Sequence, residues 1–266
     1  QRCDPGSVFR LAPSVPLRRR CALFPVGAGS YTDGMDELVH SRNSMAARRK
    51  AATPAQASNP QVSRTNDPAR TMAGILAVAT KEFAAKGLSG ARIDAIAEAT
   101  HTSKRMIYYY YGSKEGLYVA VLEESYRRMR QIEGQLHLED MEPEAALRRL
   151  VEFTFDRHAD NEDFIRLVMN ENIEQGSYLA QSKTIQQLNV PAIEAIRQLY
   201  DRGVQQGVFR PGLDPVDIHA SISALTFFNV SNRHTFGLIF KDKAQDAQSD
   251  ARRASITEMV VRFVRK

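Results

Sequence analysis

Apolar side chains recur every three or four residues from Asp67 to the C-terminus, and this helical period most limits how the chain can fold. The last segment shows it plainly, since from about residue 250 the apolar positions i, i+3, i+4, i+7 and i+8 hold Ile256, Met259, Val260, Phe263 and Val264. No alternation typical of a β-strand extends over a useful length. The sequence therefore predicts an all-α fold of about nine helices.

Residues that start and stop helices divide this pattern into segments. Asp67 followed by Pro68 is typical of a helix start, because Asp accepts hydrogen bonds from free N–H groups and the N–H that Pro lacks is not needed there. Gly87 is expected to end that helix. Pro191 is expected to start or kink a later one. The other helices are expected over residues 92–99, 103–111, from 113, from 142, 163–175, 182–206, 214–232 and from 250.

Residues 1–66 show no sustained period and are rich in Pro, Gly, Ala, Ser and Arg. They hold ten Lys and Arg against four Asp and Glu, whereas residues 67–266 hold 26 basic and 27 acidic side chains. The formal net charge of +5 therefore comes from this segment and not from the helical body. We interpret residues 1–66 as a disordered basic N-terminal extension, within which Met45 and its basic neighbours would also fit a natural start of the chain.

The chain lacks the sequence signals of several functional classes. Cys3 and Cys21 are its only cysteines, and no run approaches the ~20 apolar residues that span a bilayer. The apolar run after Arg20 stops at Pro25, too early for a signal peptide. Neither His-x-x-x-His spacing nor a nucleophile or nucleotide-binding motif occurs. We therefore expect a cytoplasmic protein that is not an enzyme, with no catalytic residues, no metal, no cofactor and no membrane partner.

Residues 92–111 predict a helix-turn-helix, which is two short helices joined by a three-residue turn. Ile93, Ile96 and Ala97 would face inward, and Ser103 would cap the second helix. That helix would expose basic and phenolic groups, namely Lys104, Arg105, Tyr108 and Tyr109. Such groups suit the phosphate-lined major groove of DNA. The window 81–114 is also locally basic, with six Lys and Arg against three Asp and Glu.

The chain from Arg70 to Leu117 resembles the TetR/AcrR family of bacterial transcriptional regulators without a gap. The matching residues are Arg70, Ile75, Leu76, Ala79, Phe83, Gly87, Ile96, Ala97, Glu98, Ser103, Lys104, Ile107, Tyr108, Tyr111, Lys114, Glu115 and Leu117. The resemblance covers roughly a fifth of the chain, and the helical remainder agrees with the family only in length and class.

This resemblance implies a three-helix helix-turn-helix DNA-binding domain over residues 67–126 and a helical ligand-binding and dimerisation domain over residues 127–266. It implies a homodimer that binds a pseudo-palindromic operator in double-stranded DNA and is released by a small-molecule effector. Most members with this architecture are repressors. A helical binding or enzymatic domain with a vestigial helix-turn-helix is the alternative, and the basic extension as the main nucleic-acid element is a weaker one.

The resemblance also implies DNA contacts at particular positions. The positions that commonly contact phosphates hold Tyr108, Tyr109 and Lys114, and those that face base edges or the backbone beside them hold Lys104, Arg105 and Met106. Arg92 replaces the usual Thr, so it could reach a phosphate but cannot cap the helix. His101 replaces the usual Gly of the turn, where a positive φ is expected. Tyr110 and Tyr111 are expected to pack inward.

In the C-terminal part, isolated polar groups stand on apolar faces. His158 and Asn172 are interpreted either as hydrogen-bonded core residues or as ligand contacts, and the pocket is expected to be lined by Phe155, His158, Asn172 and Phe228. Glu171 and Glu174 are interpreted as part of a solvated face. The stripe Ile256, Met259, Val260 and Phe263 could be core or interface, and we expect it to form, together with the helix over 214–232, a dimer interface in a four-helix bundle.

Overall fold

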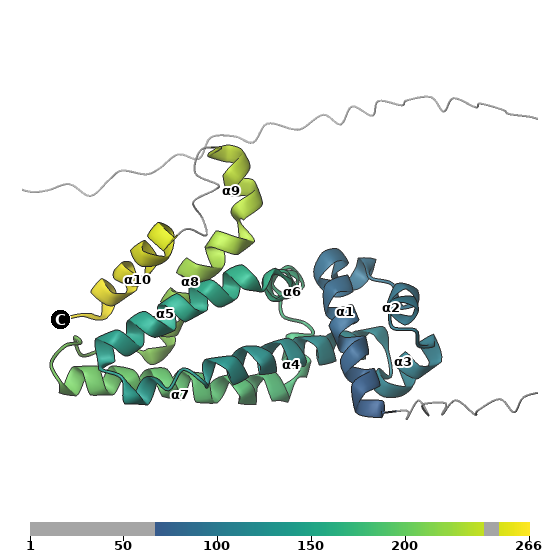
Figure 1. Ribbon diagram of the computed structural model, residues 1–266, viewed down its shortest axis with the longest axis horizontal. Coiled ribbons are helices and arrows are strands. Elements are labelled where there is room, and N and C mark those ends of the chain that lie inside the picture. Colours follow the sequence, from purple (N-terminus) through teal and green to yellow (C-terminus); the bar gives the residue numbers. More distant parts are fainter. Residues whose placement is uncertain (1–66, 242–249) are drawn as a thin grey trace, which may run out of the picture. The chain divides into compact units, whose positions relative to one another are not determined.

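The computed structural model describes residues 67–241 and 250–266, and these residues form ten α-helices with two short 3-10 helices (Figure 1). The α-helices are α1 Pro68–Gly90, α2 Ile93–Ala99, α3 Lys104–Tyr111, α4 Lys114–Glu133, α5 Pro143–Asp160, α6 Glu162–Ile173, α7 Lys183–Gln205, α8 Pro215–Ser231, α9 Arg233–Ile239 and α10 Asp250–Val264. The 3-10 helices are Leu138–Asp140 and Leu179–Gln181. The predicted all-α fold is confirmed, and the predicted extension over residues 1–66 lies outside the described residues.

The helix boundaries follow the capping residues that the sequence indicated. The Asp67 carboxylate accepts from the backbone N–H groups of Ala69 and Arg70, and the Ser113 hydroxyl accepts from that of Gly116 at 2.9 Å. Gly87 has a φ of +67°, so it breaks the regular helix before a last short turn. Pro191 lies inside the continuous α7 and does not start it. The short α9 was not predicted, because only Asn232 separates it from α8.

Two main cores hold the helices together. One gathers α1 to α4 around Phe83, Ile107 and Tyr118, and Leu167 of α6 is buried in the same core because α6 packs against α1. The other joins α5, α7, α8 and α10 around Leu147, Ile222 and other aliphatic side chains. The continuous α4 belongs to both parts: it packs against α1 and α3 near its start and against α7 farther along, and it passes through the expected domain boundary at residue 126. Among the described helices, none combines the length and apolar character needed to cross a membrane.

Candidate nucleic-acid interface and ligand cavity

The α2–α3 unit has the tight turn that the sequence predicted. His101 adopts a φ of +51°, and the N–H of Thr102 donates to the carbonyl of Ala97 at 3.0 Å. Arg92 occupies the N-cap of α2 without a capping side-chain hydrogen bond, while its backbone N–H donates to Glu82 Oε1 of α1 at 3.1 Å. The start of α2 is therefore held by α1, and the Arg92 side chain is left exposed to solvent.

Helix α3 is capped at its start and anchored on one side. The Ser103 hydroxyl accepts from the N–H of Met106 at 3.2 Å, and Ile107 is fully buried. Tyr110 and Tyr111 pack against the core, and the Tyr111 hydroxyl donates to the carbonyl of Met72 at 3.2 Å. The opposite face of α3 is open to solvent.

That open face carries the side chains that the resemblance assigns to DNA. Tyr109 is 77% exposed and Tyr108 is 43% exposed, and Arg105 and Met106 are exposed beside them. Lys104 pairs with Asp94 of α2 through two exposed side chains. Lys114 Nζ donates to the carbonyl of Ser89 at 3.3 Å, so it also stabilises the end of α1. The structure thus brings the predicted residues to one surface, where phenolic and basic groups surround a short helix.

The four predicted ligand-binding residues do not share one cavity. Phe155 lies in the core of α5, and Phe228 is 43% exposed with its ring at 5.8 Å from that of Phe236. Asn172 is exposed, and its Nδ2 donates to the carbonyl of Val168 within its own helix. The prediction that Asn172 stands on the buried apolar face of its helix is wrong. Helix α6 buries a different stripe, formed by Phe164, Ile165, Leu167 and Glu171. His158 lines a small cavity between α4, α5 and α8, and the other three line neither that cavity nor the larger one beside α4.

The expectation that Glu171 belongs to a solvated face is also wrong, because this residue is only 3% exposed. Its Oε2 accepts from the N–H of Leu179 at 2.8 Å. Burial and the neighbouring carboxylate raise the pKa of Tyr118, which lies on α4. This contact could not be predicted from the sequence, because it forms only when the segment after α6 folds back onto Glu171.

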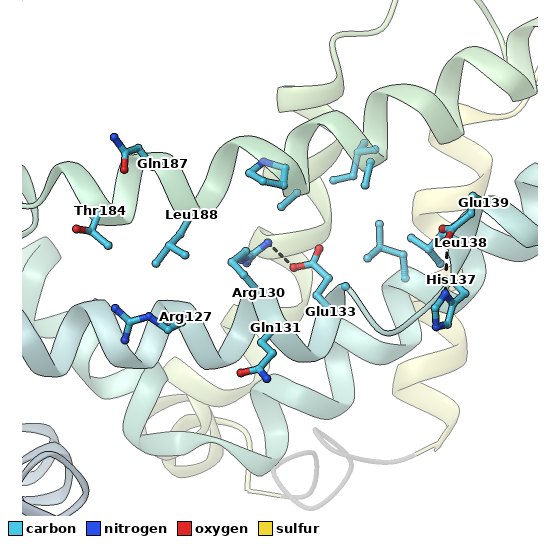
Figure 2. A pocket seen from close by; sticks show the side chains of 16 residues that line it. Arg127, Arg130, Gln131, Glu133, His137, Leu138, Glu139, Thr184, Gln187 and Leu188 are labelled. Carbon is cyan, nitrogen blue, oxygen red and sulfur yellow. Dashed lines mark ion pairs between the residues drawn. The ribbon is translucent and has the colours of Figure 1, made fainter. Parts of the chain in front are cut away.

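A cavity of about 640 Å³ lies between α4, the connection that follows it, α5 and α7 (Figure 2). Leu138, Leu150 and Leu188 give it an apolar wall, which Ala192, Ala195 and Ile196 extend. Its polar lining comes mostly from α4 and the following connection: Arg127, Arg130, Gln131, Glu133, His137 and Glu139. An apolar cavity with a few polar groups at one side has the general form of a small-molecule site.

A second, small cavity of about 20 Å³ lies deeper, between α4, α5 and α8. Arg130, Glu133 and Leu150 line both cavities. Burial lowers the pKa of His158 to about 4 and also lowers the pKa of His219, so both imidazoles are neutral at pH 7. The His158 Nδ1 lies 3.0 Å from the Thr226 hydroxyl. Of this inner group, the sequence indicated only His158.

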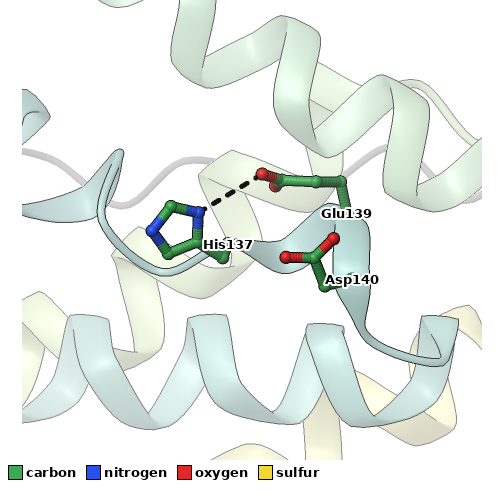
Figure 3. A group of neighbouring side chains, drawn as sticks. All are labelled: His137, Glu139 and Asp140. Carbon is green, nitrogen blue, oxygen red and sulfur yellow. Dashed lines mark ion pairs between the residues drawn. The ribbon is translucent and has the colours of Figure 1, made fainter.

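His137, Glu139 and Asp140 bring potential metal-ligand atoms within 4.8 Å of one another on the connection after α4 (Figure 3). His137 Nδ1 lies 3.5 Å from Glu139 Oε1, and all three side chains are exposed. An exposed acidic cluster of this kind is common on protein surfaces without an ion, and no further group of the described residues points toward one here.

The predicted dimer stripe divides between two environments. Ile256 and Val260 are buried in the chain's own core, where they pack with α5 and α8, so the structure corrects the prediction for these two residues. Met259 is 41% exposed, and Phe263 is partly buried below the guanidinium of Arg210, at 5.0 Å from the ring centre. Exposed apolar side chains on neighbouring helices α8 and α9 include Phe228, Phe236, Leu238 and Ile239.

Comparisons with known proteins match most of the described chain. A family model for bacterial regulatory proteins of the tetR family matches residues 75–121, and a tetracyclin repressor-like C-terminal domain model matches residues 143–264. The HTH-type transcriptional repressor NicS of Pseudomonas putida is 35% identical over 182 residues, which are 68% of this chain and 86% of that protein. The HTH-type transcriptional repressor SCO4008 of Streptomyces coelicolor is 33% identical over 139 residues, covering 52% and 69%. The solved structure of the transcriptional regulator SCO4942 from Streptomyces coelicolor aligns with a TM-score of 0.55 at 28% identity, covering 73% of this chain and 98% of that one.

Proposed function

Because the chain belongs to the TetR family of bacterial transcriptional regulators, we propose that it is a ligand-responsive DNA-binding repressor, not an enzyme. The observation that carries the proposal is α3, a capped helix that is anchored by Ile107 and exposes Arg105, Tyr108 and Tyr109. Repression is the sign of regulation named for two relatives, NicS and SCO4008.

In this proposal α3 enters the major groove of the operator. Lys104, Arg105 and Met106 face base edges or the backbone beside them, and the phosphates are met by Arg92, Tyr108, Tyr109 and Lys114. Ser103 caps the helix and lies at the same surface. Breaking the ion pair between Lys104 and Asp94 costs little free energy, because both side chains are about half exposed to solvent.

The C-terminal helices supply the other two parts of the proposal. Two chains join through exposed positions of α8 and α10, so that the paired α3 helices read the two halves of a pseudo-palindrome. A small-molecule effector binds among α4 to α8 and favours a state whose α3 helices are wrongly spaced, which requires a coupling free energy of about 1–3 kcal/mol. The protein then acts in the cytoplasm, on nucleoid DNA, without a membrane partner.

Variants of the α3 surface test the proposed DNA contacts. Tyr109→Ala and Lys114→Ala should weaken binding to every duplex to a similar extent, because phosphate contacts position the protein without reading sequence. Lys114→Ala should also lower the slope of log affinity against log salt by about 0.9. Lys183→Ala, which removes an exposed charge from α7, is the matched control and should leave the slope unchanged. Salt-independent duplex binding by the unmodified chain would favour the vestigial alternative.

A further inference from the structure

The cavity of about 640 Å³, here called the outer cavity, and the cavity of about 20 Å³, here called the inner cavity, meet at one ion pair on α4. Arg130 and Glu133 line both cavities, and their side chains are only 16% and 14% exposed (Figure 2). Leu188 projects from α7 toward this pair across the outer cavity. A molecule held in the outer cavity would therefore have a buried charge pair at one end and aliphatic side chains along its length.

The guanidinium of Arg130 has more donors than the protein satisfies. Its Nη1 is paired with the Glu133 carboxylate, whereas its Nε is buried without a hydrogen-bond acceptor among the described residues. A buried donor without an acceptor is destabilising, so such a group in a native structure calls for a specific explanation. An acceptor supplied by a ligand is one explanation that also fits the adjoining cavity.

Apart from Glu133, the larger cavity has one other carboxylate, that of Glu139, which is exposed and lies 3.5 Å from His137 Nδ1. His158 and His219 line the inner cavity as neutral imidazoles, and Thr154 and Ser223 contribute only hydroxyl groups. On the outer side Arg127 adds another guanidinium, which is paired with Glu124. The carboxylate nearest to Arg130 is therefore that of Glu133, and burial raises the pKa of Glu133 while Arg130 opposes this increase.

From this arrangement we propose that the effector is an organic carboxylate with an apolar body. Its carboxylate accepts hydrogen bonds from the guanidinium of Arg130, whose Nε–H has no acceptor in the protein, and its body packs against Leu188, Ala192 and Ile196 of α7. This inference rests on the proposed function, because it names the chemical class of the effector. Occupancy would act directly on α4, the helix that packs against α3 and α1 at its other end.

The test compares carboxylates with matched neutral and cationic compounds. Benzoate, cyclohexanecarboxylate and octanoate are titrated into the full chain by calorimetry, each beside the primary amide and the primary amine of the same skeleton. We expect at least one carboxylate to bind about tenfold more tightly than its amide and its amine, because a hydrogen-bonded charge pair is lost in both substitutes.

Two variants then locate the binding. Arg130→Gln should weaken that carboxylate about tenfold or more, whereas Arg197→Gln on an exposed part of α7 should have no effect. Glu133→Gln should strengthen carboxylate binding, because it removes the competing negative charge and keeps the side-chain shape. If Arg130 served only in folding, Glu133→Gln would not strengthen carboxylate binding. Should Arg130→Gln not fold, Arg130→Lys is the second variant; it keeps the positive charge but loses the two parallel N–H donors, so it should give an intermediate affinity.

Equal binding of amides or amines would overturn the proposal, as would unchanged affinity in Arg130→Gln or the absence of binding by every skeleton. Duplex binding by the unliganded protein is measured separately. Its loss would contradict the proposed function, whereas failure of the titrations alone would contradict only the effector class.

Discussion

The protonation of one buried residue, His158, affects the stability of the whole fold. Its pKa is about 4 in the folded chain against 6.5 in an exposed histidine, because burial disfavours the charged ring. The unfolded chain therefore binds more protons between these two values, so stability is complete above about pH 6.5 and falls as the pH drops toward 4. The difference corresponds to about 3 kcal/mol.

We expect His158→Gln to flatten this pH dependence. Urea unfolding of the two proteins at pH 7.5 and pH 5 measures the effect, and the wild-type chain should lose more stability between these values than the variant. An identical loss in both proteins would show that His158 is not the group that titrates. His219, whose pKa is lowered in the same direction, would then be the next candidate.

Position 203 has room only for glycine, which neither composition nor periodicity reveals. A Cβ at this position would lie 2.0 Å from the Phe209 ring, which is buried and stacked on Tyr200. Gly203→Ala should therefore destabilise the chain by about 1–3 kcal/mol through overpacking. Gly74→Ala is the matched control inside α1, where no atom lies within 4 Å, and it should stabilise by about 0.5–1 kcal/mol. Thermal unfolding decides whether the two shifts have opposite signs.

The short helix α3 depends on its Ser103 cap. It has only eight residues, and isolated helices this short are marginal in water. Ser103→Ala should cost about 1 kcal/mol of stability and weaken duplex binding, because the exposed face of α3 loses its fixed orientation. Asp214→Ala removes a comparable cap from α8 and should cost similar stability with no change in duplex affinity at a temperature where both variants are folded. Equal effects on duplex affinity would argue against α3 as the recognition helix.

The sequence predicted the elements well where local chemistry decides them. Caps at Asp67, Ser103 and Ser113 depend on neighbours a few residues away, and the structure has all of them. The positive φ of His101, which the family resemblance implied, is also present. The buried face of α6 was predicted wrongly, because two apolar stripes compete on that helix and only its contact with α1 selects one. The cavity beside Arg130 was missed for the same reason, since α4, α5, α7 and α8 must assemble before the pair is covered.

The interface between two whole chains depends on which apolar residues stay outside the core of each chain. Met259→Lys and Phe228→Glu place a charge on exposed positions of α10 and α8, so we expect folded monomers that bind the operator poorly. Val260→Lys instead places a charge in the core of the chain itself and should unfold it. Sedimentation at micromolar concentration, with circular dichroism to check folding, separates these outcomes, and stable dimers of both exposed-site variants would place the interface elsewhere.

If paired α3 helices read a two-fold symmetric DNA site, the purified full chain should select such sites from a random pool of duplexes. We predict enrichment of a pseudo-palindrome whose half-sites lie about one helical turn apart, near 34 Å. We also predict that Arg105→Ala relaxes the preference at particular bases while Tyr109→Ala lowers recovery of all sequences. Failure to enrich any sequence, or enrichment of a single half-site that is indifferent to both substitutions, would show that paired α3 helices do not read a symmetric site.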